Sequence, residues 1–345
     1  MLNLSINFHE EPKNKRKKEK WRLFNAKDFQ SLMYPCFTLC RILGICPHKI
    51  NASTFEVSKL YYILSIVAIC FYNIYILITL YNFPNHINDF PVYFIMYCAL
   101  VFGDLIMIIS VILTGPRTRF LQTILKISSR IPSKSYQKLS RLIHTKDIIG
   151  FLLAWIILIH ASKLETTILF QNYSHLFIHQ MDMLYINCVC ILKACFKGIN
   201  DNLVNMQKFI VTNNESHFPR PIYYKQRNPF LIMELKILKK QHLTVSKAVQ
   251  MLSMIFSLQL LATTVIIFSQ ISLILYYYIL FKRYLLPVDI LFDMLFLLYT
   301  AYLFIKMILI VWACETSKNQ AQQISSSIYD ALNSTTDEQI KDEVV

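Results

Sequence analysis

Residues 248–280 read AVQMLSMIFSLQLLATTVIIFSQISLILYYYIL, a stretch that contains no Asp, Glu, Lys or Arg. A lipid bilayer has a hydrocarbon core about 30 Å thick, which about 20 apolar residues cross as an α-helix. Lipid offers backbone N–H and C=O groups no hydrogen-bonding partner, so a spanning segment of this kind must be helical. The stretch therefore predicts a transmembrane helix that is longer than one crossing needs.

The composition of the whole chain agrees with a membrane protein. Hydrophobic residues make up 55% of the 345 positions and charged residues 16%, whereas soluble domains carry about 25% charged residues. The formal net charge of +14 could indicate nucleic-acid binding, but the Lys and Arg residues cluster beside apolar stretches. Anionic lipid on the cytoplasmic side accounts for such clusters. We therefore expect contact with membrane lipid and none with nucleic acid.

Five other apolar stretches are long enough to cross a bilayer. The fourth stretch is the weakest, because Asp182 and Lys193 lie within it and charges inside a bilayer are costly. The predicted fold class is an all-α polytopic membrane protein with six transmembrane helices. Their predicted ranges are 60–83, 92–114, 148–168, 176–195, 248–280 and 288–312.

The connections between these stretches are alternately crowded with Lys and Arg and almost free of them. Residues 1–59 and the connections after the second and fourth stretches are basic, and cytoplasmic loops carry such an excess. Lys282 and Arg283 lie in a predicted outer loop, but the Lys and Arg residues of the predicted inner segments far outnumber them. We expect a cytoplasmic basic segment at 1–59, a transmembrane bundle at 60–312 and a cytoplasmic tail helix at 313–345.

Glycosylation and cysteine positions fit this orientation. Of the Asn-x-Ser/Thr triplets, only the one at Asn172 falls in a predicted outer loop, at 169–175, so Asn172 is the glycosylation candidate. All nine cysteines lie in predicted spans or on the inner side, which leaves no outer disulfide. Cys36, Cys40, Cys46 and His48 could be read as zinc ligands, but their spacing is loose and ordinary apolar cysteines are the simpler interpretation. No metal or cofactor is expected.

Three segments of the chain carry a resemblance to a known family. Residues 28–47, DFQSLMYPCFTLCRILGICP, look like the segment before the first span in the insect gustatory receptor family. Residues 241–279, QHLTVSKAVQMLSMIFSLQLLATTVIIFSQISLILYYYI, resemble its fifth helix, and 311–332, VWACETSKNQAQQISSSIYDAL, its cytoplasmic segment after the sixth. The resemblance runs from about Asp28 to the end of the chain. It implies seven helices with a cytoplasmic amino terminus, and four subunits around a cation pore that small-molecule tastants open.

The sequence departs from that pattern at its end. The family's seventh helix, which lines the pore, should follow the acidic tail helix, but the chain stops at Val345. Three explanations are open: a gene-model or splice truncation, a degraded gene copy, or a short isoform that assembles with full-length subunits. The alternative to a working receptor subunit is thus a truncated, non-conducting assembly partner or a defective receptor fragment.

Several polar and aromatic residues inside the predicted spans are candidates for binding a small molecule. A pocket in a helical bundle needs aromatic contact and a few polar groups, and most of these residues fall in the predicted outer half of the bilayer. A belt of tyrosines at the membrane interface and hydrogen bonds between helices are the alternative interpretations. The predicted ligand-binding residues are Tyr97, Asp104, His160, His179, Asp182, Gln270 and Asp293. Whether the ligand is a sugar or a bitter compound stays open.

Two inner segments have helical periodicity. Pro229 can begin a helix with Leu231, Leu235 and Leu238 on one face. The tail repeats at Ala321, Ile324 and Ile328, with Thr316 or Ser317 as candidate caps. These helices could lie on their own subunit, but the resemblance implies that they join subunits in a homo- or hetero-tetramer.

Other function classes fit less well. No triad order, metal-binding His pair or Gly-rich phosphate loop indicates an enzyme, and no span with repeated Arg indicates a voltage sensor. A six-span transporter stays possible, although broken helices at matching positions are missing. A G-protein-coupled receptor would need the opposite orientation. We therefore predict a gustatory receptor subunit of the plasma membrane, a ligand-gated cation channel component that is not an enzyme.

Overall fold

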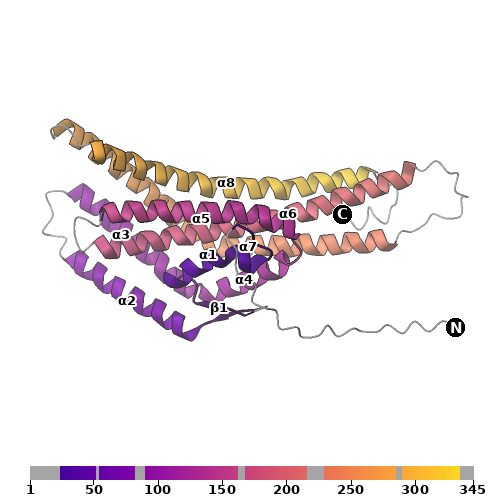
Figure 1. Cartoon of the computed structure of the whole chain (residues 1–345), viewed down its shortest axis with the longest axis horizontal. Coiled ribbons are helices and arrows are strands. Elements are labelled where there is room, and N and C mark those ends of the chain that lie inside the picture. The colour runs from indigo at the N-terminus through magenta and orange to yellow at the C-terminus, as the bar shows by residue number, and fades with distance from the viewer. Residues whose placement is uncertain are drawn as a thin grey trace, which may run out of the picture.

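The computed structural model describes residues 24–51, 54–81, 90–161, 168–215, 229–284 and 290–334. This part of the chain forms an elongated bundle of helices and one small hairpin (Figure 1). The helices are α1 (Phe29–Ile42), α2 (Lys59–Tyr81), α3 (Phe90–Ile112), α4 (Thr114–Ser128), α5 (Ser133–Ala161), α6 (Ile168–Glu215), α7 (Pro229–Tyr284) and α8 (Ile290–Ser334). The antiparallel hairpin joins β1 (His48–Asn51) to β2 (Thr54–Val57). The all-α fold class is confirmed, with this hairpin as its one addition among the described residues.

Most of the predicted spans coincide with helices. By length and composition, α2, α7 and α8 could each cross a membrane, and α3 with α4 would make a fourth span bent by 65°. The predicted third and fourth spans, 148–168 and 176–195, fall within the longer helices α5 and α6. A polytopic membrane fold is confirmed, while the count of six crossings and the cytoplasmic amino terminus stay predictions.

Three helices are far longer than a membrane is thick. Helices α6, α7 and α8 have 48, 56 and 45 residues. At 1.5 Å per residue they extend roughly 72, 84 and 68 Å, about twice the 30 Å hydrocarbon core. Each must therefore project beyond the bilayer, and on the predicted orientation it does so on the cytoplasmic side.

The two predicted inner helices are continuations of these long helices. Helix α7 begins at Pro229, as predicted, and Leu235 and Leu238 are buried. The predicted caps at Thr316 and Ser317 are wrong, because α8 runs through them without a break. The last turns of α8 still pack inward, since Ile324 is 1% exposed.

Another correction concerns the predicted outer loop at 169–175. In the structure these residues form the first turns of α6. Nothing in this segment breaks a helix, because it contains neither Gly nor Pro. Asn172 therefore lies on a helix, half-buried, and its glycosylation stays a prediction.

Helix α6 lies at the centre of the bundle, where it packs against α1, α3, α4, α5, α7 and α8. Every residue from 177 to 192 is buried. The predicted weakness of this span came from Asp182 and Lys193, but both charges have partners on α8. Lys306 pairs with Asp182, and the Lys193 ammonium lies 5.3 Å from the centre of the Trp312 ring.

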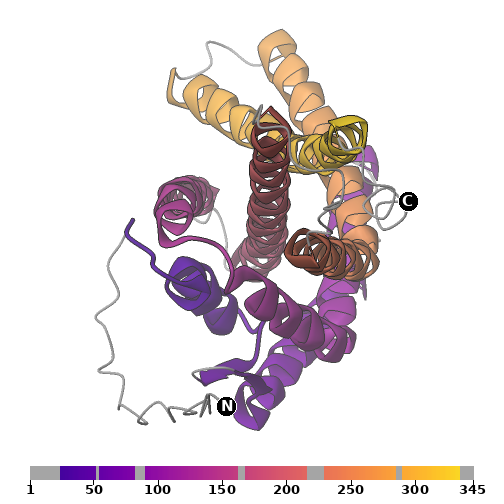
Figure 2. The ribbon, with the colours of Figure 1, turned by 90° about the vertical axis from the view of Figure 1, so that its right-hand side faces the viewer.

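The described part of the segment before the first span, from Phe24 onward, contains α1 and the hairpin. Asp28 caps α1, because its Oδ1 accepts a 2.8 Å hydrogen bond from the Ser31 backbone N–H. Figures 1 and 2 show that α1 and the hairpin lie on the opposite side of the bundle from α8. On that side the Gln180 amide of α6 donates to the Cys36 carbonyl at 3.3 Å. This helix thereby docks against the central helix of the bundle.

Cysteines of α1 lie in this interface. Cys36 and Cys40 of α1, and Cys46 shortly after its end, are buried, and burial raises the pKa of the Cys40 thiol well above its ordinary value. Among the described residues, no group of three or more His, Cys, Asp and Glu side chains could hold a metal ion. The side chain of His48 lies outside the described part. The described thiols thus act as small apolar side chains that pack α1 against α6.

Candidate functional site

A buried group of four polar side chains connects α6, α7 and α8. The Lys306 ammonium lies 2.7 Å from Asp182 Oδ2. Gln259 Nε2 and Thr263 Oγ1 donate hydrogen bonds to Asp182 Oδ1 at 2.9 and 3.2 Å. All four residues are at most 6% exposed. We call Asp182, Gln259, Thr263 and Lys306 the polar centre.

Local sequence and helical geometry produce this arrangement. Gln259 and Thr263 are four residues apart, so they lie one turn apart on the same face of α7. Asp182 is fully buried, and an isolated carboxylate in such a place would be strongly destabilising. One ammonium and two neutral donors satisfy it here. The polar centre therefore requires all three helices to keep their relative positions.

A second polar pair lies one turn away. His179 precedes Asp182 by three residues on α6, and Tyr302 precedes Lys306 by four on α8. The Tyr302 hydroxyl and His179 Nδ1 are hydrogen-bonded at 2.8 Å. His179 Nε2 is buried and has no hydrogen-bond partner in the described part of the chain. Its ring lies against α5 at Gly150.

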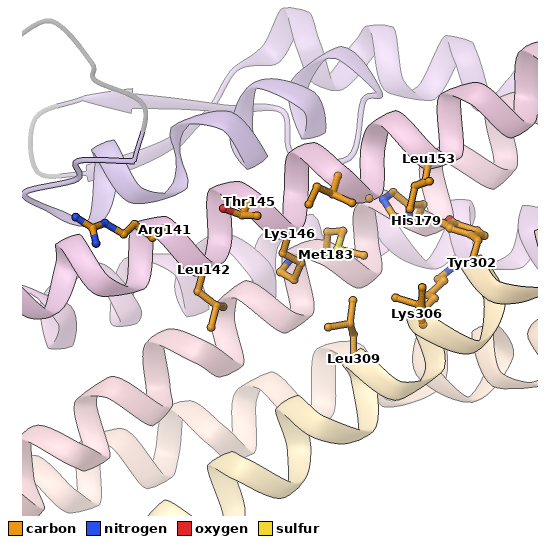
Figure 3. A pocket seen from close by; sticks show the side chains of 13 residues that line it. Arg141, Leu142, Thr145, Lys146, Leu153, His179, Met183, Tyr302, Lys306 and Leu309 are labelled. Atoms are coloured by element: carbon orange, nitrogen blue, oxygen red, sulfur yellow. Dashed lines mark hydrogen bonds between the residues drawn. The ribbon is translucent and has the colours of Figure 1, made fainter. Parts of the chain in front are cut away.

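An apolar cavity of about 530 Å³ lies between α5, α6 and α8. Figure 3 shows Arg141 at one end of its lining and His179 with Tyr302 at the other. The lining residues are Arg141, Leu142, Thr145, Lys146, Ile149, Gly150, Leu153, His179, Met183, Tyr302, Ile305, Lys306 and Leu309. Arg141 and Lys146 belong to the predicted cytoplasmic connection, so the cavity reaches toward that side rather than being confined to the predicted outer half.

A further polar group lies beside the cavity at Lys146. Asp147 lies next to the Lys146 ammonium and accepts a 2.8 Å hydrogen bond from Asn187 Nδ2 of α6. Asp147 is 3% exposed. This contact fixes the position of α5 against α6 beside the cavity.

Gly150 leaves the space that the His179 ring occupies. A Cβ atom added at Gly150 would lie 3.2 Å from His179 Nε2, whereas one added at Gly103 would meet only ordinary contacts from 3.5 Å. Ala is the better helix former by about 1 kcal/mol. We expect Gly103→Ala to raise the free energy of unfolding by about 0.5–1 kcal/mol, and Gly150→Ala to lower it by about 1–2 kcal/mol through overpacking.

Thermal unfolding of the detergent-purified variants would test this expectation. His179→Ala removes the crowded ring. In that variant, adding Gly150→Ala should not lower the free energy of unfolding further. Equal effects of alanine at Gly103 and Gly150 would contradict the close approach of α5 to His179.

The structure brings only some of the predicted ligand-binding residues together. His179 lines the cavity and Asp182 belongs to the polar centre. Asp104 lies elsewhere, where it accepts a 3.0 Å hydrogen bond from Asn73 Nδ2 between α2 and α3. Gln270 on α7 and Asp293 in the first turn of α8 are half-buried.

Two other predicted residues cannot be placed in this way. Tyr97 and His160 belong to α3 and α5, but their side chains lie outside the described part of the structure. Ligand binding by all seven residues stays a prediction.

Sequence reasoning missed five members of this region: Gln259, Thr263, Tyr302, Lys306 and Gly150. One available signal was the sign of the intramembrane charges, since Lys306 is a cation and Asp182 an anion, and buried charges require partners. The neutral donors gave no comparable signal, because Gln, Thr and Tyr also occur at lipid-facing and interfacial positions.

A buried polar centre that connects three helices is compatible with many kinds of membrane protein. A comparison with protein families narrows the class of protein. The sequence model of a family described as 7tm Chemosensory receptor matches residues 33–344. The chain belongs to the 7tm chemosensory receptor family. A comparison with curated proteins gave no match.

Membership confirms the resemblance at the level of the chemosensory receptor family, which is not an enzyme family. Together with the apolar helices it identifies a multi-pass membrane receptor. In this chemosensory receptor, α6, α7 and α8 carry the polar centre, and α5 completes the wall of the adjoining cavity.

Proposed function

We propose that this chemosensory receptor is a gustatory receptor subunit of the plasma membrane, a component of a cation channel opened by a small-molecule tastant. The observation that carries the proposal is the polar centre, which joins α6, α7 and α8 through the Asp182 carboxylate. Charged groups inside a membrane are costly and are typically kept for function. A pair of opposite charges between helices also has two distinct states, joined and separated.

The long helices give the polar centre a way to act at a distance. Each of α6, α7 and α8 is about twice as long as the bilayer is thick, so a tilt within the membrane displaces its far end. A ligand that binds one arrangement of the three helices better than another shifts the population toward it. We propose that tastant binding changes the α6 to α8 contact in this way.

The His179 and Tyr302 pair is the group that we propose to sense the tastant. It is one turn from the polar centre toward the predicted outer side. A hydroxyl or carbonyl of a ligand could replace the hydrogen bond between Tyr302 and His179. Gln270 lies seven residues from Thr263 on the same face of α7, two turns farther out, and would contact the same ligand.

Assembly into a homo- or hetero-tetramer is part of this proposal. The extension of α7 carries exposed apolar side chains, with Met233 53%, Ile237 46% and Leu243 53% exposed. These side chains lie beyond the predicted span 248–280, where a neighbouring subunit could cover them. Such contacts would join the extended helices of several subunits below the membrane.

Calcium imaging of cells that express the chain, alone and with candidate partner subunits, tests the function. We expect an influx on addition of a compound from a panel of sugars and bitter molecules. Tyr302→Phe removes only the hydroxyl and should raise the half-effective concentration up to about tenfold, the equivalent of one hydrogen bond. Tyr81→Phe is the control, because Tyr81 is 85% exposed on α2.

A response only with a partner subunit would support an assembly role within the channel. The proposal fails if cells in which staining shows the receptor at the surface respond to no compound with any partner subunit. The assigned role of Tyr302 fails if its dose-response curve overlays that of the unmodified receptor.

A further inference from the structure

We propose that the cavity between α5, α6 and α8 holds one acyl chain of an anionic phospholipid from the cytoplasmic leaflet, with the headgroup at Arg141. This lipid site adjoins the proposed tastant contacts, because the lining of the cavity ends at the His179 and Tyr302 pair. The proposal rests on the length of the cavity, its lateral opening and the charges of its lining.

The length of the cavity fits a headgroup and the upper part of one acyl chain. Its α5 wall runs from Arg141 to Leu153, and twelve residues at 1.5 Å per residue give roughly 18 Å. On the predicted span 148–168, about 10 Å of this length lies in the headgroup layer and about 8 Å in the hydrocarbon, which is about half of the 15 Å that one leaflet contributes. The first half of an acyl chain that enters near Arg141 would therefore reach Leu153 and the His179 and Tyr302 rings.

The walls of the cavity open sideways onto the apolar outer surface of the bundle. Among the lining residues, Leu142 is 40%, Ile149 52% and Ile305 50% exposed. A molecule dissolved in the hydrocarbon can reach the cavity past these side chains without crossing water. Lipid is the molecule that is always present at that surface, whereas a water-soluble ligand would have to enter from an end.

The charges of the lining select an anionic headgroup. The lining contains Arg141, Lys146 and Lys306 but no Asp or Glu. Lys146 and Lys306 already have carboxylate partners in Asp147 and Asp182. Arg141 is exposed, and within the described ranges no ion pair involves it.

The height of Arg141 also fits a headgroup. It precedes the predicted third span by seven residues, which corresponds to about 10 Å along the helix. The headgroup layer lies just outside the hydrocarbon core, and the cytoplasmic leaflet is the anionic one. A guanidinium at that level can bind a phosphate or carboxylate with two parallel hydrogen bonds.

Photolabelling in lipid nanodiscs tests the site with the full chain. The probe is phosphatidylserine with a diazirine on its acyl chain, and phosphatidylcholine with the same diazirine is the neutral comparison. Digestion and mass spectrometry should locate the phosphatidylserine label on peptides that contain Leu142, Leu153 and Leu309. One cation near an anionic surface corresponds to about fivefold in binding, so Arg141→Gln should lower this label about fivefold.

Two matched controls separate the site from general effects. Lys134→Gln removes an exposed cation two turns away on the same face of α5 and should leave the label unchanged. Leu153→Trp fills the end of the cavity and should remove the label there. Leu152→Trp should not, because Leu152 is 53% exposed and lies outside the lining.

Three results would overturn the proposal. The first is a label that never reaches the cavity peptides. The second is equal labelling by both probes that Arg141→Gln leaves unchanged, which would remove the headgroup assignment. The third is displacement of the label by free oleate at low concentration, which would make a single-chain carboxylate the occupant.

Discussion

Replacing Asp182 with asparagine should destabilise the receptor by about 3–5 kcal/mol, because the Lys306 ammonium then stays buried without its counter-charge. The side chain keeps its size, and its carbonyl oxygen can still accept hydrogen bonds from Gln259 and Thr263, so packing is preserved. The charge imbalance alone accounts for the expected loss. In detergent, the unfolding temperature should fall by roughly 5–10 °C, as fluorescence-detected size-exclusion chromatography after heating would measure.

Asp201→Asn is the matched control for this substitution. Asp201 lies on the same helix but is exposed, so its neutralisation should change the free energy of unfolding by less than about 0.5 kcal/mol. If Asp182→Asn lowers the free energy of unfolding no more than Asp201→Asn does, the ion pair contributes nothing to stability. The proposed role of this pair in holding α6 against α8 would then be wrong.

Replacing Arg117 with alanine is expected to lower the free energy of unfolding by about 2–3 kcal/mol. The side chain is 1% exposed, and its Nη1 donates to the Ile45 carbonyl at 2.8 Å and to Ser110 Oγ at 3.0 Å. Alanine would leave a cavity and an unpaired carbonyl at the bend between α3 and α4. Relief from burying a guanidinium with no carboxylate partner in the described structure offsets part of the loss.

Hydrogen exchange distinguishes this local role from a general effect. Exchange in residues 43–57 should rise in Arg117→Ala, because Ile45 ties that segment to α4. Arg119→Ala should leave both exchange and stability unchanged, since Arg119 is exposed two residues farther along α4. Unchanged exchange at 43–57 in the Arg117 variant would contradict the proposed tie.

Much of the fold could be predicted because transmembrane helices can be recognised from local composition alone. The stretch 248–280 needs no tertiary information to be recognised as a span, and α7 contains it entirely. The fourth span was harder, since Asp182 and Lys193 weaken its hydropathy. Their partners, Lys306 and Trp312, lie more than a hundred residues away in the sequence. Pairing at that distance is set by tertiary packing, which local composition does not contain.

Arg117 shows the same limit at the inner side of the membrane. Its position in a basic connection made it one of many residues that indicate orientation, and on that basis an exposed side chain would be expected. The structure buries it, because the chain bends by 65° between α3 and α4 and folds α4 back against the bundle. Charge counting predicts a side of the membrane but not which of the charges are buried.

The candidate site, too, could be predicted from the sequence only in part. His179 and Asp182 could be selected because buried titratable groups inside a span are costly and rare. Asp104 was selected for the same reason, yet it pairs with Asn73 between α2 and α3, away from the cavity. The cavity depends on the spacing of three helices, which the chemistry of a single residue does not encode.

The claim that an intramembrane ion pair holds α6 against α8 is tested most directly by a double-mutant cycle on Asp182 and Lys306. The unfolding free energies of Asp182→Asn, Lys306→Met, their combination and the unmodified receptor are measured in one detergent. We predict that each single change costs about 3–5 kcal/mol and that the double change costs less than either one, because no unpaired charge then stays buried. Strictly additive losses would contradict the account, since they would mean that the two charges do not interact.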